Sequence, residues 1–332
     1  MPLSPALIFD LFNGYQRTAA VRAAVELDLF TRVARGHDST AALARDAQAS
    51  ERGLRILADA MAVMGLLEKN EDRYKLTEDS AAFLNRESPM FIGDALNFLN
   101  APIMTEAFGQ LAQAARQGGT ALKGDPANAP NSEYWVAFAR HMGRLQTGGA
   151  HGLAELLVPK PDGAMKVLDI AAGHGQFGIA MAQRNPQAEV YALDWARVLD
   201  VAKENAASAG VDGRMHWLEG SAFELDWGSG YDWVLMPNFL HHFDRATCVA
   251  LLRRAKQALA PGGELAILEF VVDSDRVHPP QSALFAMIML ATTESGDAYT
   301  SDEYESMLHE AGFEETELHP LPPGFQRAII AS

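Results

Sequence analysis

Hydrophobic residues recur at three- and four-residue spacing through the first half of the chain, which predicts mostly helical structure there. Leu7, Ile8, Leu11 and Phe12 follow this spacing near the start, and residues 135–157 form a long predicted helix with one apolar side. Beyond residue 165, short apolar runs alternate with helical segments. This alternation is typical of an α/β protein whose parallel sheet is covered by helices on both faces.

The change of pattern coincides with a proline-bounded segment, residues 158–163, which ends the long helix. We therefore expect two domains, a helical one over residues 1–157 and an α/β one over residues 158–332. The charge changes at the same point, from 15 basic and 18 acidic residues before it to 12 basic and 25 acidic residues after it.

Within the helical region, residues 40–44 and 51–64 are predicted helices, and residues 65–68 and 73–77 are short strands around a polar tip. Helix, turn, helix and hairpin make a winged-helix outline. DNA binding is one use of such a unit, but residues 37–80 hold six basic against nine acidic side chains. A scaffold or dimerisation role is favoured, and we expect the apolar faces of the first helices to pack on another subunit.

The second region begins with alternating strands and helices and ends in a predicted hairpin. Five strands are expected first, at residues 166–170, 189–193, 214–218, 233–236 and 264–270, with helices that begin near Gly175, Arg197, Arg245 and Ser301. Residues 313–318 and 325–331 then form a hairpin around a proline-rich turn, residues 320–324. The last strand is therefore expected to be antiparallel to its neighbour.

Composition narrows the function classes. The 332 residues are 48% hydrophobic and 21% charged, which is the range of a soluble globular protein. A formal charge of −16 disfavours nucleic acid and anionic membrane surfaces as partners. The single cysteine, Cys248, makes no intrachain disulfide. No signal peptide is visible, and the longest apolar run, residues 283–291, is too short to span a bilayer, so we expect a cytoplasmic enzyme.

The most informative segment is residues 167–178, where an apolar strand ends at an acid and a loop of small residues opens a helix. Gly173, Gly175 and Gly178 match the dinucleotide-binding fingerprint, although glycines also serve plain turns. Asp169 lies close to where a pyrophosphate would sit, and its charge instead suits a ligand with a cationic end. Asp194 ends the second strand, where a carboxylate accepts ribose hydroxyls in either nucleotide class.

With these motifs the chain resembles the class I S-adenosylmethionine-dependent methyltransferases. Asp-x-Ala-x-Gly-x-Gly at residues 169–175 departs from the family pattern at Ala171, and residues 259–267 match the proline–glycine turn before the family's fifth strand. More closely, the chain resembles the two-domain O-methyltransferases of the plant caffeate and acetylserotonin type and their bacterial relatives. The resemblance implies a Rossmann-like seven-stranded, mostly parallel sheet with an antiparallel last strand. It also implies an N-terminal winged-helix domain that forms a homodimer.

The resemblance also implies S-adenosyl-L-methionine as the cofactor. Carried over by position, its contacts come from the glycine loop, the end of the second strand and two later loops: Asp169, Ala171, Gly173, Gly175, Asp194, Trp195, Ser221, Ala222, Phe223 and Asn238. The family usually has Asp where Ser221 stands. The contact to the adenine amino group is therefore weakened or comes from elsewhere.

Residues 236–243 match the family segment that carries the catalytic histidine, and His241 falls on that position. Glu269 ends the next strand, as the family's histidine-orienting glutamate does. Neighbouring strand ends converge, and a carboxylate that accepts the Nδ1 proton would leave Nε2 free to act as a base. Adjacent side chains diverge on such a loop, so we expect one of His241 and His242 to face the pocket. A structural hydrogen-bonding role is the alternative.

Candidate acceptor contacts are apolar residues suited to a flat aromatic molecule, together with one histidine: Trp135, Phe138, Met142, Phe239, His242, Met287, Leu290 and Thr293. Plain core packing is the alternative for the helix face with Trp135, Phe138 and Met142. It is equally the alternative for Met287 and Leu290. No cluster of acids has metal-ligand spacing, so no metal is expected.

One departure keeps other reactions open. The family's second supporting acid falls on Ala298, so Asp297 or Glu294 substitutes, or the acceptor needs less help from a base. The sequence therefore favours O-methylation of a small-molecule hydroxyl. C- or N-methyl transfer, an NAD-dependent dehydrogenase and a non-catalytic cofactor-binding dimer remain as alternatives.

Overall fold

The computed structural model describes residues 3–123, 132–160, 163–322 and 324–332. Pro161 and Asp162 of the predicted interdomain segment and Pro323 of the predicted turn lie outside the described residues. The chain forms two compact units, Met1–Asn97 and Phe98–Ser332. The short helix α7 (Ala95–Leu99) spans their boundary.

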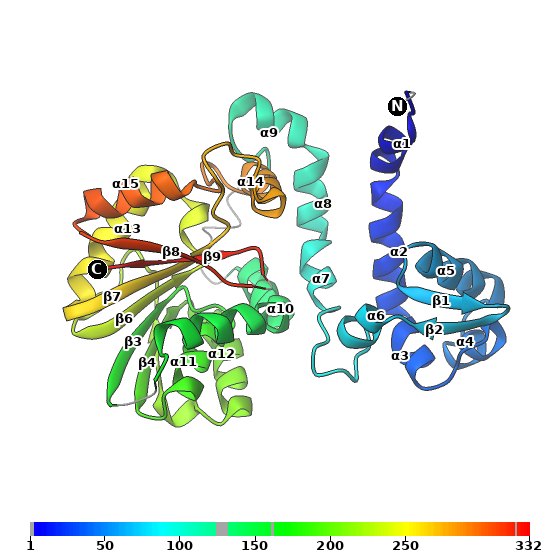
Figure 1. Ribbon diagram of the computed structural model, residues 1–332, viewed down its shortest axis with the longest axis horizontal. Helices are drawn as coiled ribbons and strands as arrows, with labels where there is room; N and C mark the ends of the chain where they lie inside the picture. Colours follow the sequence, from blue (N-terminus) through cyan, green and yellow to red (C-terminus); the bar gives the residue numbers. More distant parts are fainter. Residues whose placement is uncertain (1–2, 124–131, 161–162, 323) are drawn as a thin grey trace. The chain divides into compact units, whose positions relative to one another are not determined.

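The first unit contains six helices and a two-stranded antiparallel hairpin among its described residues (Figure 1). In chain order these are α1 (Ala6–Phe12), α2 (Gly14–Glu26), α3 (Leu29–Ala34), α4 (Thr40–Asp46), α5 (Glu51–Val63), β1 (Leu67–Asn70), β2 (Arg73–Leu76) and α6 (Glu78–Phe83). The helix, helix and hairpin predicted between residues 40 and 77 are present in this order.

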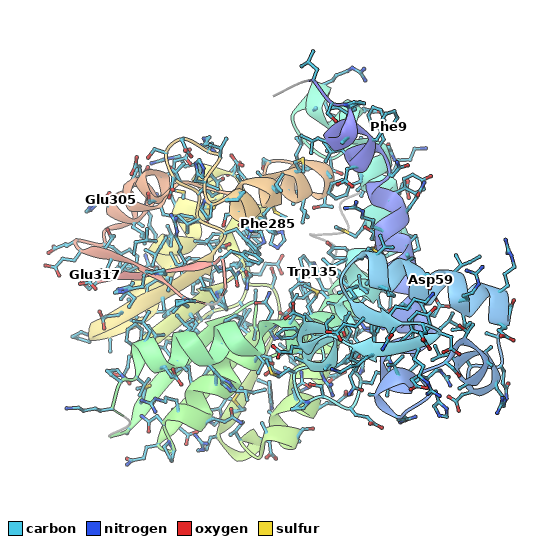
Figure 2. The ribbon with its side chains drawn as sticks, turned by 45° about the vertical axis from the view of Figure 1, so that its right-hand side comes forward. Phe9, Asp59, Trp135, Phe285, Glu305 and Glu317 are labelled. Carbon is cyan, nitrogen blue, oxygen red and sulfur yellow. The ribbon has the colours of Figure 1, made fainter. Side chains whose placement is uncertain are left out.

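Local hydrogen bonds cap two of these helices and join one of them to the hairpin. The hydroxyls of Ser39 and Ser50 accept the backbone N–H groups of Ala42 and Gly53, and so cap α4 and α5 at their N-termini. Asp59 of α5, labelled in Figure 2, accepts hydrogen bonds from Lys69 at 2.5 Å and from the Tyr74 hydroxyl at 2.7 Å. Helix α5 is thereby tied to the hairpin.

Helix α1 leaves its apolar side chains uncovered within the first unit. Its large apolar side chains are between 50% and 69% exposed: Leu7, Ile8, Phe9, Leu11 and Phe12. An exposed apolar face of this kind marks a protein-interaction surface.

The second unit is built on a seven-stranded sheet with the order β5-β4-β3-β6-β7-β9-β8. Its strands are β3 (Met165–Ile170), β4 (Ala188–Asp194), β5 (Met215–Glu219), β6 (Tyr231–Pro237), β7 (Leu259–Glu269), β8 (Thr316–Pro320) and β9 (Arg327–Ala331). The first five are parallel to one another, and β9 is antiparallel to both β7 and β8. The predicted α/β fold with an antiparallel last strand is confirmed.

Helices bury both faces of this sheet. Alternate residues of β3 belong to different cores: Leu168 and Ile170 pack with α13 (Arg245–Ala258) and α15 (Ser301–Ala311), whereas Val167 packs with helices α10 to α12. The remaining helices of the unit are α8 (Pro102–Gly109), α9 (Leu111–Gln117), α10 (Glu133–Leu157), α11 (Gln176–Arg184), α12 (Ala196–Ala209), α14 (Pro280–Thr292) and the 3₁₀ turns η1 (Asp212–Arg214) and η2 (Leu240–His242).

The boundary between the compact units differs from the expected domain boundary at residue 157. Helix α10 inserts Leu153, Ala154 and Leu157 into the same core as Phe177 and Ile179 of α11. Helical spacing predicts that one side of α10 is buried but does not say against which partner. For this reason the sequence grouped α10 with the N-terminal helices, although it packs in the second unit.

A truncation experiment tests this grouping. A chain of residues 98–332 should unfold at a clearly higher temperature than one of residues 158–332, because the shorter chain uncovers the apolar face of α11. Circular dichroism melts of the two purified chains measure the difference. Equal midpoints would show that α10 does not belong to the core of this unit.

Candidate active site

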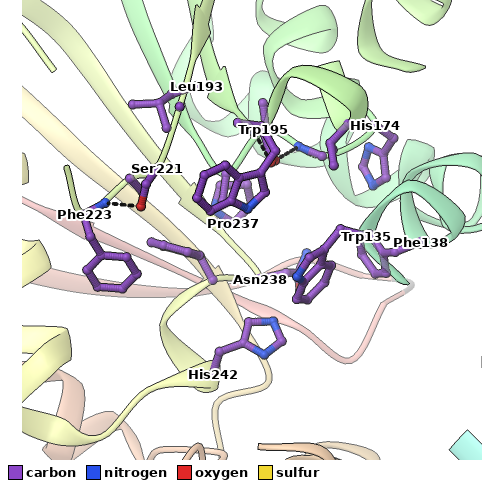
Figure 3. Close-up of a pocket in the computed structure, with 18 of the residues that line it drawn as sticks. Trp135, Phe138, His174, Leu193, Trp195, Ser221, Phe223, Pro237, Asn238 and His242 are labelled. Atoms are coloured by element: carbon purple, nitrogen blue, oxygen red, sulfur yellow. Dashed lines mark hydrogen bonds between the residues drawn. The ribbon is translucent and has the colours of Figure 1, made fainter. Parts of the chain in front are cut away.

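A cavity of about 500 Å³ opens at the carboxyl ends of the parallel strands (Figure 3). The loops that follow β3 to β6 supply most of its wall, and α10 adds two aromatic side chains. Its lining comprises Trp135, Phe138, Ala171, Ala172, Gly173, His174, Phe177, Leu193, Asp194, Trp195, Val198, Gly220, Ser221, Ala222, Phe223, Glu224, Pro237, Asn238, Phe239, His242, Phe243 and Thr247. Ligands of open α/β sheets bind at this edge.

The loop after β3 bends sharply and packs close to the sheet. Ala171, Gly173 and Gly175 have φ angles of +54°, +58° and +75°, in the left-handed region. A Cβ at Gly178 would lie 2.8 Å from Val190 Cγ1 and 3.0 Å from Asp169 Oδ2, so only glycine fits there. The glycines that matched the fingerprint thus serve both the turn and the close approach of α11 to the strands.

Asp169 lies beneath this loop and does not line the cavity. Its Oδ2 accepts the N–H of Gly178 at 3.0 Å, whereas Oδ1 is buried and has no hydrogen-bond partner among the described residues. Burial raises the pKa of this carboxyl to about 7, and the nearby Asp194 adds to the shift. Asp169 therefore holds the loop and keeps one oxygen for a further donor.

Asp194 lines the cavity at the end of β4. Its Oδ2 accepts the N–H of Gly173 at 2.8 Å, and its Oδ1 accepts the N–H of Trp195 at 2.7 Å. Burial raises the pKa of this carboxyl to about 6. Each oxygen retains a lone pair for another donor, so the site can bind two adjacent hydroxyl groups of one sugar.

The opposite wall is flat and largely apolar. Ser221 uses its hydroxyl to accept the N–H of Phe223 at 3.2 Å. The rings of Phe223 and Phe239 each meet that of Phe243 edge to face, with centroids 5.2 and 5.0 Å apart. These rings give this wall apolar surface that suits an aromatic group.

His174 was missed by the sequence prediction, although it stands in the middle of the glycine loop. Its ring is buried in the cavity wall and stacks on Phe138 of α10, with centroids 5.9 Å apart. The Nδ1 atom accepts the N–H of Gln176 at 3.2 Å, and burial lowers the pKa to about 4. His174 is therefore a neutral contact between α10 and the loop.

His241 and Glu269 form the expected pair. The Nδ1 atom of His241 lies 2.5 Å from Glu269 Oε2, and Glu269 Oε1 accepts the N–H groups of Phe239 at 3.0 Å and of His241 at 3.3 Å. Both side chains are buried, at 4% and 0% exposure. The carboxylate fixes a proton on Nδ1 and leaves Nε2 as the free, basic nitrogen.

Of the two adjacent histidines, one lines the cavity. His242 lines the cavity, beside the edge of Trp135 at 5.1 Å, whereas His241 lies behind this wall. The ring of His241 contacts Phe285 at 4.8 Å, and Phe285 in turn stacks on Phe270 at 3.7 Å. Phe285 belongs to α14 and is labelled beside that helix in Figure 2.

His242 is a neutral side chain. Burial lowers its pKa well below the ordinary value, and the neighbouring His241 adds to this effect. Its Nδ1 has no hydrogen-bond partner within the described part of the chain. The two rings lie 4.2 Å apart, so a charge on one disfavours a charge on the other.

Neither expected substitute for the second acid reaches the ring of His241. The carboxylate of Asp297 contacts Arg276 at 3.3 Å and the N–H of Ala298 at 2.8 Å, and Glu294 is exposed. Asp297 acts through its backbone instead, because its N–H donates to the carbonyl oxygen of His241 at 3.0 Å. Glu269 is thus the carboxylate that the structure places on this imidazole.

Of the predicted acceptor contacts, four line the cavity: Trp135, Phe138, Phe239 and His242. Met142 is buried within α10, and Met287 and Leu290 of α14 lie outside the cavity wall, as does Thr293. Of the predicted cofactor contacts, Asp169 and Gly175 lie behind the wall and the other eight line it. Among the residues that the structure describes, no cluster of three His, Cys, Asp or Glu side chains could hold a metal ion.

The burial of Asp169 predicts a measurable effect on stability. The folded chain raises the pKa of this carboxyl from near 4 to about 7, so the cost of its charge grows as the pH rises from about 4 to 7. Asp169→Asn should therefore stabilise the ligand-free chain at pH 8 by on the order of 2–4 kcal/mol, and by less at pH 5. Urea unfolding at both pH values measures this, with the exposed Asp212→Asn as control. A loss of stability at pH 8 would refute this account.

Comparison with known proteins agrees with the fold and the motifs. Residues 158–314 match the model of the O-methyltransferase domain, and residues 9–86 match that of the O-methyltransferase dimerisation domain. A solved structure from Nostoc punctiforme, assigned as an O-methyltransferase, is 49% identical, covers 100% of this chain and 99% of its own, and has a TM-score of 0.94.

Two curated relatives are similar over most of their length. The 3-hydroxy-5-methyl-1-naphthoate 3-O-methyltransferase of Streptomyces sahachiroi is 29% identical over 94% of this chain and 90% of its own. The acetylserotonin O-methyltransferase of Mus musculus is 27% identical over 98% of this chain and 87% of its own. The family expected from the glycine loop and the His241 segment is thereby confirmed: this chain belongs to the O-methyltransferase family that carries an N-terminal dimerisation domain.

Proposed function

We propose that this enzyme transfers the methyl group of S-adenosyl-L-methionine to a hydroxyl oxygen of a small aromatic or polyketide-type acceptor, with His241 as the general base. The buried pair of His241 and Glu269, next to a cavity with a ribose-binding carboxylate, carries this proposal. The family membership supports the same reaction.

The residues present suit the cofactor. Asp194 would accept two ribose hydroxyls, and Ser221, Ala222 and Phe223 would line the adenine. The unpartnered Oδ1 of Asp169 and the left-handed loop from Ala171 to Gly175 suit a cationic amino-acid end. Trp195 and Asn238 complete this wall. When bound, the cofactor supplies a methyl group on a positively charged sulfur, which is already activated for transfer.

The chain itself contributes alignment and a proton acceptor. A phenol has a pKa near 10, so its proton must leave as the oxygen attacks. His241 Nε2 takes this proton, and Glu269 stabilises the resulting imidazolium from the Nδ1 side. General-base assistance of this kind contributes on the order of 10²–10⁴-fold in rate. A single buried carboxylate supports the base, since Ala298 stands at the position of the second acid.

The acceptor assignment rests on the apolar wall and on the relatives. Trp135, Phe138 and Phe239 provide flat faces beside His242. We place Met142, Met287 and Leu290 at the outer part of the acceptor site, toward the stacked rings of Phe270 and Phe285. The relatives named for a hydroxynaphthoate and for acetylserotonin act on flat bicyclic molecules.

We further propose a cytoplasmic homodimer formed by the N-terminal region. Residues 1–157 are its dimerisation domain, with the winged helix in the first compact unit, and residues 158–332 are the catalytic domain, whose core also includes the apolar side of α10. The dimerisation-domain match and the exposed apolar side chains of α1 support this assembly. In the described part of the chain no helix is long and apolar enough to cross a membrane.

A methyl-transfer screen against phenols, hydroxyquinones and indoles, with the product's methyl position located by NMR, tests the reaction. His241→Ala should lower kcat by at least about 100-fold, because the base is lost, while the affinity for S-adenosylhomocysteine stays within about threefold. Glu269→Gln should lower kcat as well. Wild-type turnover by His241→Ala would remove this residue from the base role, and methylation at carbon or nitrogen would replace the proposed reaction.

Cofactor affinity should depend on pH. The pKa values of Asp169 and Asp194, raised to about 7 and 6 by burial, leave both carboxyls partly protonated in the free enzyme near pH 6. Binding favours their ionised forms, so the Kd of S-adenosylhomocysteine should fall about three- to tenfold from pH 5.5 to 7.5, with proton release. Calorimetry in buffers of different ionisation enthalpy measures both effects. The proposed contacts would be contradicted if the wild-type Kd were constant over this pH range and equal to the Kd of Asp169→Asn.

A further inference from the structure

We propose that Gln326 is a positioning residue that turns the side-chain amide of Asn238 so that its NH₂ group faces the cavity. There the amide binds an oxygen substituent next to the acceptor hydroxyl that is methylated. This inference rests on the proposed function and adds to it a preference for acceptors with two neighbouring oxygens.

Asn238 is held close to the base. It follows β6 directly, and its backbone N–H donates to the carbonyl oxygen of Leu268 at 2.8 Å. The next turn, which carries His241, is fixed to Glu269, the neighbour of Leu268 in β7. The backbone of Asn238 has a φ angle of +54°, a left-handed conformation that is rare for side chains other than glycine and is found at functional sites.

Gln326 sets the orientation of this amide. Its Nε2 donates a hydrogen bond to Asn238 Oδ1, from a position 88 residues away in the sequence. Because Oδ1 is engaged on that side, Nδ2 points away from Gln326. Asn238 lines the cavity, so this NH₂ group is a donor available to a ligand (Figure 3).

The hairpin that carries Gln326 pairs with β7 at Glu269, the residue that binds the base. Gln326 immediately precedes β9, and Arg327 is paired with Glu269 in the register of β7 and β9. Phe325 lies against Phe270, with ring centroids 5.7 Å apart. The donor, the base and its carboxylate are therefore held by neighbouring strands of one sheet.

The chemistry of the donor defines the ligand group. A neutral NH₂ group binds an oxygen with a free lone pair, such as a hydroxyl, an ether or a carbonyl oxygen. His241 must reach the hydroxyl that is methylated, and Asn238 lies three residues before it. We infer that the amide binds a second oxygen on the adjacent ring carbon. Without a partner in the complex, the half-buried amide would weaken binding.

The test uses the full-length enzyme and three probes: phenol, guaiacol and catechol. Wild type should show kcat/KM for guaiacol and catechol about tenfold or more above that for phenol. In Gln326→Glu the donor becomes a carboxylate, so the Asn238 amide inverts and its carbonyl faces the cavity. The ether oxygen of guaiacol cannot donate to this carbonyl, whereas a catechol hydroxyl can. The guaiacol-to-catechol ratio should therefore fall about tenfold.

Two further variants keep the test independent of folding. Asn238→Asp places an acceptor oxygen in the cavity while leaving Gln326 its partner, and should lower the same ratio. Gln183→Glu, the same exchange at an exposed position of α11, should change nothing. In Gln326→Glu and Gln183→Glu the Kd of S-adenosylhomocysteine should stay within about threefold of wild type.

An unchanged guaiacol-to-catechol ratio in both Gln326→Glu and Asn238→Asp would overturn this inference alone. A tenfold rise in the Kd of S-adenosylhomocysteine in Gln326→Glu, with an unchanged guaiacol-to-catechol ratio, would also overturn it. The Asn238 amide would then face the cofactor and not the acceptor. Absence of methyl transfer by wild type to any phenolic acceptor would overturn the proposed function and this inference with it.

Discussion

The buried carboxylate of Glu269 is the contact on which the site depends. It is fully buried, and it binds the imidazole of His241 and two backbone N–H groups of the turn after β6. Hydrogen bonds from three donors offset the cost of burying its charge. Because β7 lies between β6 and β9, the same residue also aligns the terminal hairpin through Arg327. Base, cavity wall and hairpin are thus organised around one side chain.

Much of this arrangement follows from the sequence, because strands buried on both faces leave a clear pattern. The predicted starts and ends of β3, β4, β5 and β6 lie within two residues of those observed. Strand β7 begins at Leu259, earlier than the predicted residue 264, because the proline–glycine turn obscures its first residues. Parallel strands bring their carboxyl ends to one edge. Asp194, Ser221 and Asn238 therefore meet in one cavity although they are far apart in the chain. The pairing of His241 with Glu269 follows from the same rule and the family resemblance.

Other features depend on tertiary contacts that no local pattern encodes. The apolar side of α10 indicates burial, but the choice of α11 as its partner is set by the loop after β3. The 3₁₀ turn η2 determines which of the two adjacent histidines faces the cavity. The sequence of this three-residue turn does not predict its geometry. Asp297 supports His241 through a backbone N–H, which any residue except proline would offer. Gln326 reaches Asn238 because it immediately precedes β9, which pairs antiparallel with β7.

The unpartnered oxygen of Asp169 has a consequence for the protein in the cell. A ligand that completes this contact lowers the free energy of the folded chain only, and so suppresses its unfolding. Proteases act on the small unfolded fraction, so a shift of one or two kcal/mol changes abundance several-fold. The amount of this enzyme should accordingly follow the supply of its methyl donor, with starved cells degrading the protein they cannot use.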